Sequence, residues 1–248
     1  MVATQGSRSR VQWSSDFTGV YTDMVWGTGQ LAAPFDGGLG FTSVNEGSFA
    51  SIRTLPDGVL AITTDTGDDD NAFLVGCPMK PSLGEGWMEA RFRTNSATLG
   101  AIYMGYTSVL AIDTPVMPAE FATVTMTYNA SATTAGMIID TDGTVIDARA
   151  AFANAGTVLS TADANGTRAN DSLVANEWMV CRVEVKPDGR ARVLFGHATD
   201  QLKLVKEVTN LPTGTILFPC LGFENRSAAA RIFSIDYFFG GSDRDWTN

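Results

Sequence analysis

An acidic stretch contains the first group of side chains that could do chemistry. Residues 66–71 read TGDDDN and offer hard oxygen ligands, of which a calcium ion takes about six to eight. The stretch lacks the ligand spacing of an EF-hand, and neighbouring side chains in one loop rarely converge on one ion. We interpret it as a solvated connection between strands, and the alternative is a calcium site formed by Asp68, Asp69 and Asp70.

A second group is a pair of glutamates. Glycoside hydrolases need two carboxylates that face each other across a cleft. Glu85 and Glu89 share the parity of one strand face, but Glu85 lies in a GEG turn, and Glu89 alternates with Arg91 and Arg93 on an expected solvent face. The sequence has no phosphate-binding loop, no H-E-x-x-H and no G-x-S-x-G. We therefore expect no enzymatic activity.

Histidine and cysteine are too scarce for the common catalytic and metal sites. His197 is the single histidine, which excludes a zinc site built on histidines and leaves one candidate for a catalytic triad. It lies in a loop, HATDQ, where we expect a hydrogen-bonded surface residue. The cysteines Cys77, Cys181 and Cys220 contain no C-x-x-C pair and are odd in number, so they predict neither a zinc ribbon nor a complete disulfide framework. We expect no cofactor.

The remaining candidates are binding residues outside the strands. Trp13, Trp26 and Trp246 lie near the chain ends or in loops, where an exposed indole can stack on a sugar or anchor an interface. Arg8 and Arg10 make the N-terminal segment locally basic in an acidic chain. They predict docking onto an acidic neighbouring surface, and the alternative is a disordered arm.

The composition favours strands and turns as the elements that position these residues. The formal net charge of -10 combines 19 Asp with 8 Glu and 13 Arg with 4 Lys, beside 25 Gly. Glu and Lys, which commonly fill exposed helix surfaces, are scarce, whereas Asp and Gly favour turns. The acidic balance also argues against direct nucleic-acid binding, which depends on Lys and Arg contacts to phosphate. We predict an all-β chain.

Turn signals recur three times between apolar runs, at residues 55–58 (LPDG), 141–143 (TDG) and 186–189 (KPDG). Proline presets the first turn position, aspartate bonds its own backbone, and glycine takes a positive φ. Each signal predicts an antiparallel hairpin. We accordingly interpret Asp140 and Asp142 as turn formers rather than metal ligands.

The flanking runs alternate between apolar and polar residues, which is typical of a sheet with one wet face. Such sheets must bury their apolar faces on each other, so we predict a two-sheet antiparallel sandwich. We expect Trp87 and Trp178, which open strands, to pack in the core. The side chains predicted to face the core are Met88, Ala90, Phe92, Cys181, Val183, Val185, Ala191, Val193, Phe195, Phe233, Ile235 and Tyr237.

No proline-rich or glycine/serine-rich linker divides the chain. We predict a flexible arm over residues 1–12, one sandwich over 13–240 and a tail over 241–248. Residues 145–153 (VIDARAAFA) are the best candidate for a helix, and residues 154–176 are expected to form loops with at most one short strand near 158–160. No secretory signal and no membrane-spanning run is recognised, which predicts folding in a cytoplasm.

The C-terminal half resembles a known fold family. It contains NEW at 176–178, a PDG hairpin at 187–189, LFPCLGFEN at 217–225 and ARIFSIDY at 230–237. This order is similar to the concanavalin A-like (laminin G-like) jelly roll. YMGYT at 103–107, TP at 114–115 and AGMIIDTD at 135–142 resemble the version found in virion structural proteins of tailed bacteriophages. The resemblance covers roughly residues 86–240, and no catalytic residues carry over.

The resemblance implies a non-enzymatic virion protein. We expect a capsid decoration or cement protein that forms a homo-oligomer, binds the major capsid protein or other virion proteins and stabilises the shell. The alternative is a lectin-like carbohydrate-binding module that adheres to glycans, on a phage tail or fibre. Neither interpretation requires nucleic acid or a membrane.

Overall fold

A computed structural model gives the structure of the chain. It describes residues 10–15, 24–26, 40–43, 47–52, 59–64, 66–67, 71–98, 100–110, 116–122, 125–141, 147–159 and 166–243. Side chains are described from residue 59 onward within these ranges, apart from residue 147 and residues 170–172. In the described part of the chain, no helix is long and apolar enough to cross a membrane.

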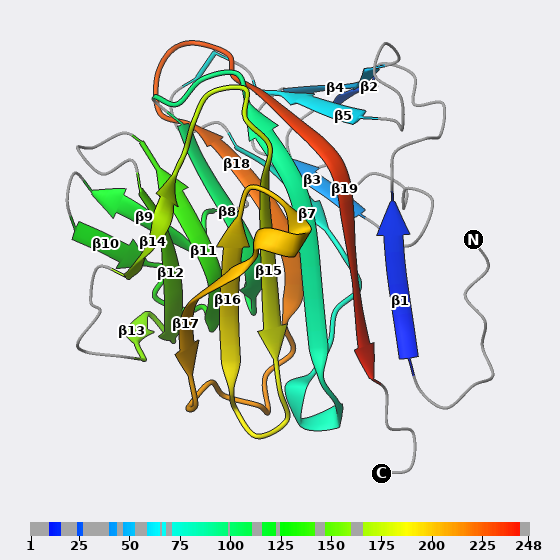
Figure 1. The fold of residues 1–248 in the computed structure, drawn as a ribbon, viewed down its shortest axis with the longest axis vertical. Helices are drawn as coiled ribbons and strands as arrows, with labels where there is room; N and C mark the ends of the chain where they lie inside the picture. The colour runs from blue at the N-terminus through cyan, green and yellow to red at the C-terminus, as the bar shows by residue number, and fades with distance from the viewer. Residues whose placement is uncertain are drawn as a thin grey trace.

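Nine strands form the first antiparallel sheet, in the order β17-β16-β15-β7-β19-β5-β4-β2, with β1 also paired to β19. In the front layer of Figure 1, the strands β17, β16, β15, β7, β19 and β1 follow one another across the sheet. The strands are β1 (Arg10–Ser15), β2 (Met24–Trp26), β4 (Gly47–Ile52), β5 (Val59–Thr63), β7 (Gly86–Thr94), β15 (Met179–Val185), β16 (Ala191–Gly196), β17 (Lys203–Val208) and β19 (Ile232–Asp243).

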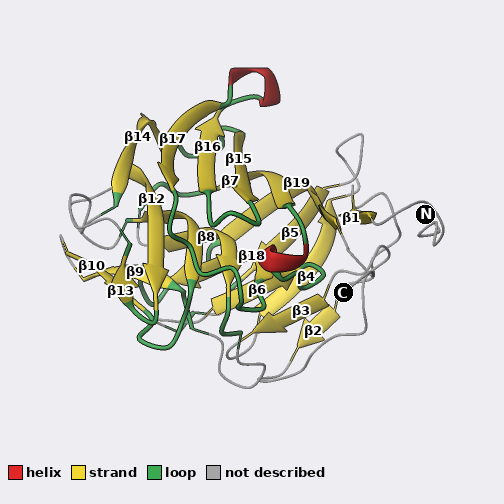
Figure 2. Cartoon of the chain, turned by 90° about the horizontal axis from the view of Figure 1, so that it is seen from below, coloured by secondary structure: helices red, strands yellow, loops and turns green. Residues whose placement is uncertain are grey.

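Eight strands form the second sheet, in the order β13-β12-β11-β8-β18-β6-β3, with β14 also paired to β12. Figure 2 shows the two sheets as separate layers. The strands are β3 (Gly40–Ser43), β6 (Asn71–Val75), β8 (Gly100–Thr107), β11 (Thr134–Asp140), β12 (Asp147–Asn154), β13 (Thr157–Val158), β14 (Thr167–Ser172) and β18 (Phe218–Asn225). A separate hairpin is formed by β9 (Ala119–Ala122) and β10 (Thr125–Tyr128), and the described residues include the short 3-10 turns η1 (Pro81–Leu83) and η3 (Thr199–Gln201).

The main core lies between the sheets and confirms the predicted alternation. On β7, Met88, Ala90 and Phe92 are buried in it. The predicted residues of β15 and β16 lie there too, and Phe223 stacks on Phe233 from the opposite sheet with ring centroids 4.2 Å apart. The two-sheet antiparallel sandwich predicted from the sequence is therefore confirmed.

A second core covers the outer face of the eight-stranded sheet. Phe73 and Tyr103 are outward-facing residues of this sheet, and both are completely buried. Met117, Phe121 and Met126, from the β9–β10 hairpin and the segment before it, pack over them. This sheet is therefore apolar on both faces, whereas the nine-stranded sheet has one apolar and one polar face.

The three predicted hairpins are confirmed by the strand pairing of β4 with β5, β11 with β12, and β15 with β16. In the last of them, Gly189 has the positive φ of 83° that the turn signal required. The connections of the other two hairpins, residues 53–58 and 142–146, lie outside the described residues.

The helix predicted over residues 145–153 is wrong, because residues 147–154 form strand β12. Its alanines alternate between the two cores, with Ala148 and Ala150 in the main core and Ala151 in the second. The strand pairing with β11 overrides the helix propensity of alanine. The interpretation of residues 154–176 also missed β14, whose polar sequence TRANDS gives no strand signal.

Both ends of the sandwich extend beyond the predicted bounds. β1 begins at Arg10, and this residue pairs with Asp243 at the end of β19. Residues 10–12 and 241–243, expected in the arm and tail, therefore form part of the sheet.

The environments of the cysteines predict their reactivity. Cys181 and Cys220 are completely buried, and burial raises the pKa of both thiols far above the ordinary value, whereas Cys77 is partly exposed. We expect an aromatic disulfide reagent to react with one thiol of the native protein and with all three after unfolding. Cys77→Ser should abolish the native reaction, and fast labelling of two or more native thiols would contradict the structure.

Candidate functional site

A β-bulge in β19 determines which side chains face outward at the centre of the nine-stranded sheet. Ile235 pairs with Phe92, but Tyr237 pairs with the next residue of β7, Arg91, so β19 has one extra residue. Such an insertion reverses the facing of all the residues after it. Phe238 therefore enters the core, and the prediction that Tyr237 faces the core is wrong.

Glu89 lies beneath the displaced tyrosine. Glu89 points to the outer face of the sheet, as predicted. It was expected to be exposed to solvent, but only 2% of the residue is accessible. The hydroxyl of Tyr237 donates a hydrogen bond to Glu89 Oε1 at 2.9 Å, and Arg182 Nη1 lies 3.6 Å from Glu89 Oε2. Because the Tyr237 hydroxyl donates its hydrogen to Glu89, the hydroxyl of Thr199 in η3 donates to the phenol oxygen, at 3.0 Å. The segment around η3 stands over the outer face of the sheet (Figures 1 and 2).

Aromatic rings surround this buried carboxylate. Trp87 meets Phe239 edge to face with centroids 5.3 Å apart, and Tyr237 lies 5.0 Å from Phe239. The guanidinium of Arg182 lies 5.0 Å from the centroid of the Trp87 ring. Contacts of this kind hold partly exposed rings in fixed positions on a rigid sheet.

Trp178 forms the adjoining part of the same surface. Two guanidinium groups lie over its ring, that of Arg91 at 4.9 Å and that of Arg93 at 4.6 Å from the centroid. Arg91 also donates to Asp236 Oδ2 at 2.8 Å. We call this region the aromatic–arginine surface and define it by Trp87, Glu89, Arg91, Arg93, Trp178, Arg182, Asp236, Tyr237 and Phe239.

The expected core packing of Trp87 and Trp178 is wrong, since both are partly exposed on this outer face. The sequence does indicate the outward position of Trp87, because Trp87 shares the strand parity of Glu89 and Arg91. Trp178 precedes the strand, so parity alone does not place it.

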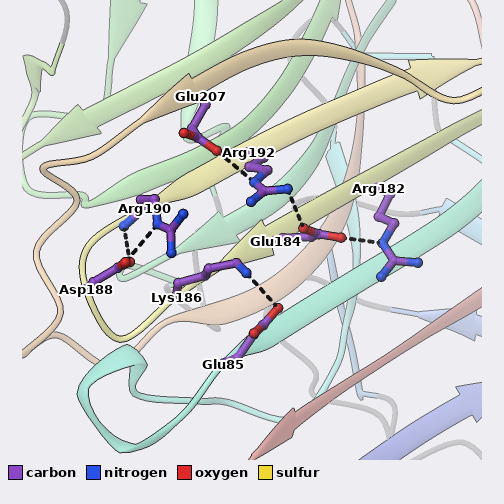
Figure 3. A network of polar contacts seen from close by, with 8 residues as sticks. All are labelled: Glu85, Arg182, Glu184, Lys186, Asp188, Arg190, Arg192 and Glu207. Carbon is purple, nitrogen blue, oxygen red and sulfur yellow. Dashed lines mark hydrogen bonds and ion pairs between the residues drawn. The ribbon is translucent and has the colours of Figure 1, made fainter.

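Ion pairs continue the surface toward the edge of the sheet, as Figure 3 shows. Arg192 bridges Glu207 at 2.7 Å and Glu184 at 3.9 Å, and Arg182 reaches Glu184 at 2.9 Å. Lys186 lies 3.6 Å from Glu85, so Glu85 and Glu89 have different partners and do not form an isolated carboxylate pair. Among the described residues no carboxylate pairs with Arg93, which leaves its charge available on the surface.

A second polar group lies at one end of the eight-stranded sheet, which we call the carboxylate–arginine cluster. Arg226 follows β18 and reaches Asp140 Oδ2 and Glu224 Oε1, each at 2.9 Å, and Glu120 Oε2 at 3.5 Å. The Phe121 amide donates to Asp140 Oδ2 at 2.8 Å. Asp140 is completely buried at the end of β11 and accepts bonds from two other segments, so it does more than form a turn; the turn itself, residues 142–146, and Asp142 lie outside the described residues.

The charges in this cluster stabilise one another. Burial alone would lower the pKa of Arg226, but Glu224, Asp140 and Glu120 outweigh that effect and raise it above the ordinary value. The guanidinium is therefore charged, although its side chain is only 9% exposed. No local sequence pattern indicates this contact, since Asp140 and Arg226 are 86 residues apart.

Most of the binding residues predicted from the sequence lie where the structure describes little. Arg8, Trp246 and the candidate calcium ligands Asp68, Asp69 and Asp70 lie outside the described residues. Of the others, only the backbone is described: Arg10 and Trp13 belong to β1, and Trp26 ends β2.

His197 follows β16, and its Nδ1 lies 3.7 Å from Glu177 Oε2 at the surface. Within the described ranges, no three histidine, cysteine or acidic side chains are arranged to hold a metal ion.

Comparison with known proteins places this architecture in a fold class. No family model matches the sequence, and no curated protein is similar to it. Among solved structures, a protein of unknown function, SO2946 from Shewanella oneidensis MR-1, superposes with a TM-score of 0.65 at 16% identity, covering 100% of this chain and 92% of that one. The Emp47p carbohydrate recognition domain has a TM-score of 0.53 at 13% identity, covering 94% and 98%.

The exoplasmic/lumenal domain of VIP36, in a Ca2+/Man-bound form, has a TM-score of 0.51 at 13% identity, covering 85% and 84% of the two chains. At these identities the likeness concerns the fold. The chain thus has the concanavalin A-like jelly roll of lectin domains, as the sequence resemblance implied; the likeness to the bacteriophage version stays a prediction.

The half-buried phenol of Tyr237 on the aromatic–arginine surface predicts a pH dependence. Burial raises the pKa of Tyr237 from 10.0 to about 12, with Glu89 adding to the shift and Thr199 opposing it. A raised pKa in the folded state contributes stability that is complete below pH 10 and is lost as the pH rises toward 12.

We therefore expect the unfolding free energy, measured with urea, to fall over this pH window less steeply in Tyr237→Phe than in the wild type. Equal slopes in the two proteins would show that Tyr237 titrates normally.

Proposed function

We propose that this chain is a lectin-like, non-enzymatic module that binds glycans through the aromatic–arginine surface. Its fold is shared with carbohydrate recognition domains. The observation that carries the proposal is the arrangement of Trp178 beneath two arginines, next to Asp236 and Tyr237, on the polar face of a rigid sheet.

The chemistry of this surface suits a sugar. A pyranose ring has an apolar face that can pack on an indole, and hydroxyl groups that bond to planar guanidinium and carboxylate groups. The ion pairs and ring contacts hold these groups in place before a ligand arrives, so binding loses little side-chain entropy. Arg93, which has no carboxylate partner among the described residues, favours a glycan that carries a carboxylate or sulfate.

We also propose, as a second candidate, that the module belongs to a virion, as a capsid decoration or cement protein. The pairing of Arg10 with Asp243 supports this role, because it brings β1 and the end of β19 together at one place, where a neighbouring subunit can contact both strands. Purified particles should then contain the protein in stoichiometric amounts. Their proteome would exclude the role if it lacked the chain.

A glycan array tests the first proposal. We expect the wild type to bind acidic glycans, and Trp178→Ala and Arg93→Gln each to weaken binding by about tenfold or more, the effect of losing roughly 1.4 kcal/mol at an anchor residue.

The control is Ile216→Ala, which removes a 55% exposed apolar side chain from the segment before β18 and should bind normally. If the folded wild type binds no glycan on the array, or if Trp178→Ala binds as well as the control, the proposed site is wrong.

A further inference from the structure

The carboxylate–arginine cluster has a composition that metal ions also use. VIP36 was solved with Ca2+ bound, so a jelly roll of this class can hold a cation. In this chain, three carboxylates from separate segments converge: Glu120 from β9, Asp140 from β11 and Glu224 from β18. Asp140 and Glu224 are buried, and Glu120 is partly exposed, so the buried part of this charge requires a cation to balance it.

The residues of the cluster do not fit a metal ion. Calcium needs about six to eight oxygen ligands at roughly 2.3–2.6 Å. Here the guanidinium of Arg226 lies between the carboxylates, with nitrogens 2.9 Å from both Asp140 and Glu224, and so takes the central position. Arginine keeps its proton in proteins, so this position remains filled by a positive charge.

We infer that Arg226 is a built-in cation, which balances the carboxylates of this cluster as a bound metal ion would and makes the stability of the cluster independent of added metal. The charge is tethered to β18 two residues after Glu224, one of its partners, so it is supplied by folding itself. Unlike a bound ion, it cannot dissociate or be chelated.

The position of Arg226 also explains what the charge holds together. Glu120 and the Phe121 amide both belong to β9, and they contact Arg226 and Asp140 respectively. Phe121 is in turn part of the second core. The cluster therefore fastens the β9–β10 hairpin over the outer face of the eight-stranded sheet, and loss of the charge should loosen this cover first.

Thermal unfolding in chelator, calcium and potassium tests the inference without reference to glycan binding. We expect the Tm of the wild type to differ by less than about 1 °C between EDTA, millimolar CaCl2 and KCl. Arg226→Ala should lower the Tm by roughly 10 °C, because it removes the guanidinium that pairs with the buried carboxylates of Asp140 and Glu224. Calcium, but not EDTA, should restore several degrees to this variant.

Two further variants separate charge from packing. Arg226→Lys retains a positive charge and should be more stable than Arg226→Met, which retains only bulk. Arg190→Met, on the β15–β16 turn, removes an arginine that is 42% exposed and pairs with Asp188; it should leave the Tm nearly unchanged.

Stabilisation by calcium, or destabilisation by EDTA, of the chain with Asp68, Asp69 and Asp70 changed to Asn would overturn the inference even if no Arg226 variant folds. Equal Tm values for Arg226→Lys and Arg226→Met, or a folded Arg226→Ala that does not respond to calcium, would also overturn it.

Discussion

The burial of both faces of the eight-stranded sheet is the constraint on which the rest of the structure depends. Every residue of β11 is buried, as are nearly all of β8 and β18. An antiparallel sheet of this kind needs a cover on its outer side, which the β9–β10 hairpin supplies. The polar groups at the strand ends must then be satisfied away from bulk water, and Arg226 does this by joining Asp140, Glu224 and Glu120.

The nine-stranded sheet is under the opposite constraint. Its inner face completes the main core, and its outer face remains in contact with solvent, so charged and aromatic side chains can collect there without disturbing the fold. The bulge in β19 brings Tyr237 over Glu89, and the neighbouring arginines lie over indole rings. Under the proposed function, recognition would belong to the solvent-facing side of this sheet alone, which packing in the two cores does not constrain.

The sequence predicted the elements that local patterns control and missed those that distant contacts control. Turn chemistry located three hairpins, and alternation placed Met88, Phe92 and Val183 in the core. One added residue in β19 was invisible to alternation, so Tyr237 was assigned to the wrong face. The pairing of Arg226 with Asp140 spans 86 residues, and no local pattern indicates it. Trp87 shares the strand parity of Glu89, which indicates the outer face, whereas the preference of tryptophan for protein cores indicates the opposite face.

Nitrogen–proton correlation spectra of the indole and arginine side chains, recorded during a titration with an acidic glycan, can locate the bound ligand. Binding to the aromatic–arginine surface should shift the indole signal of Trp178 and the Nε signal of Arg93 while that of Arg226 stays in place. Shifts at Arg226 with none at Trp178 would put the glycan on the eight-stranded sheet and contradict the assignment of recognition to the aromatic–arginine surface.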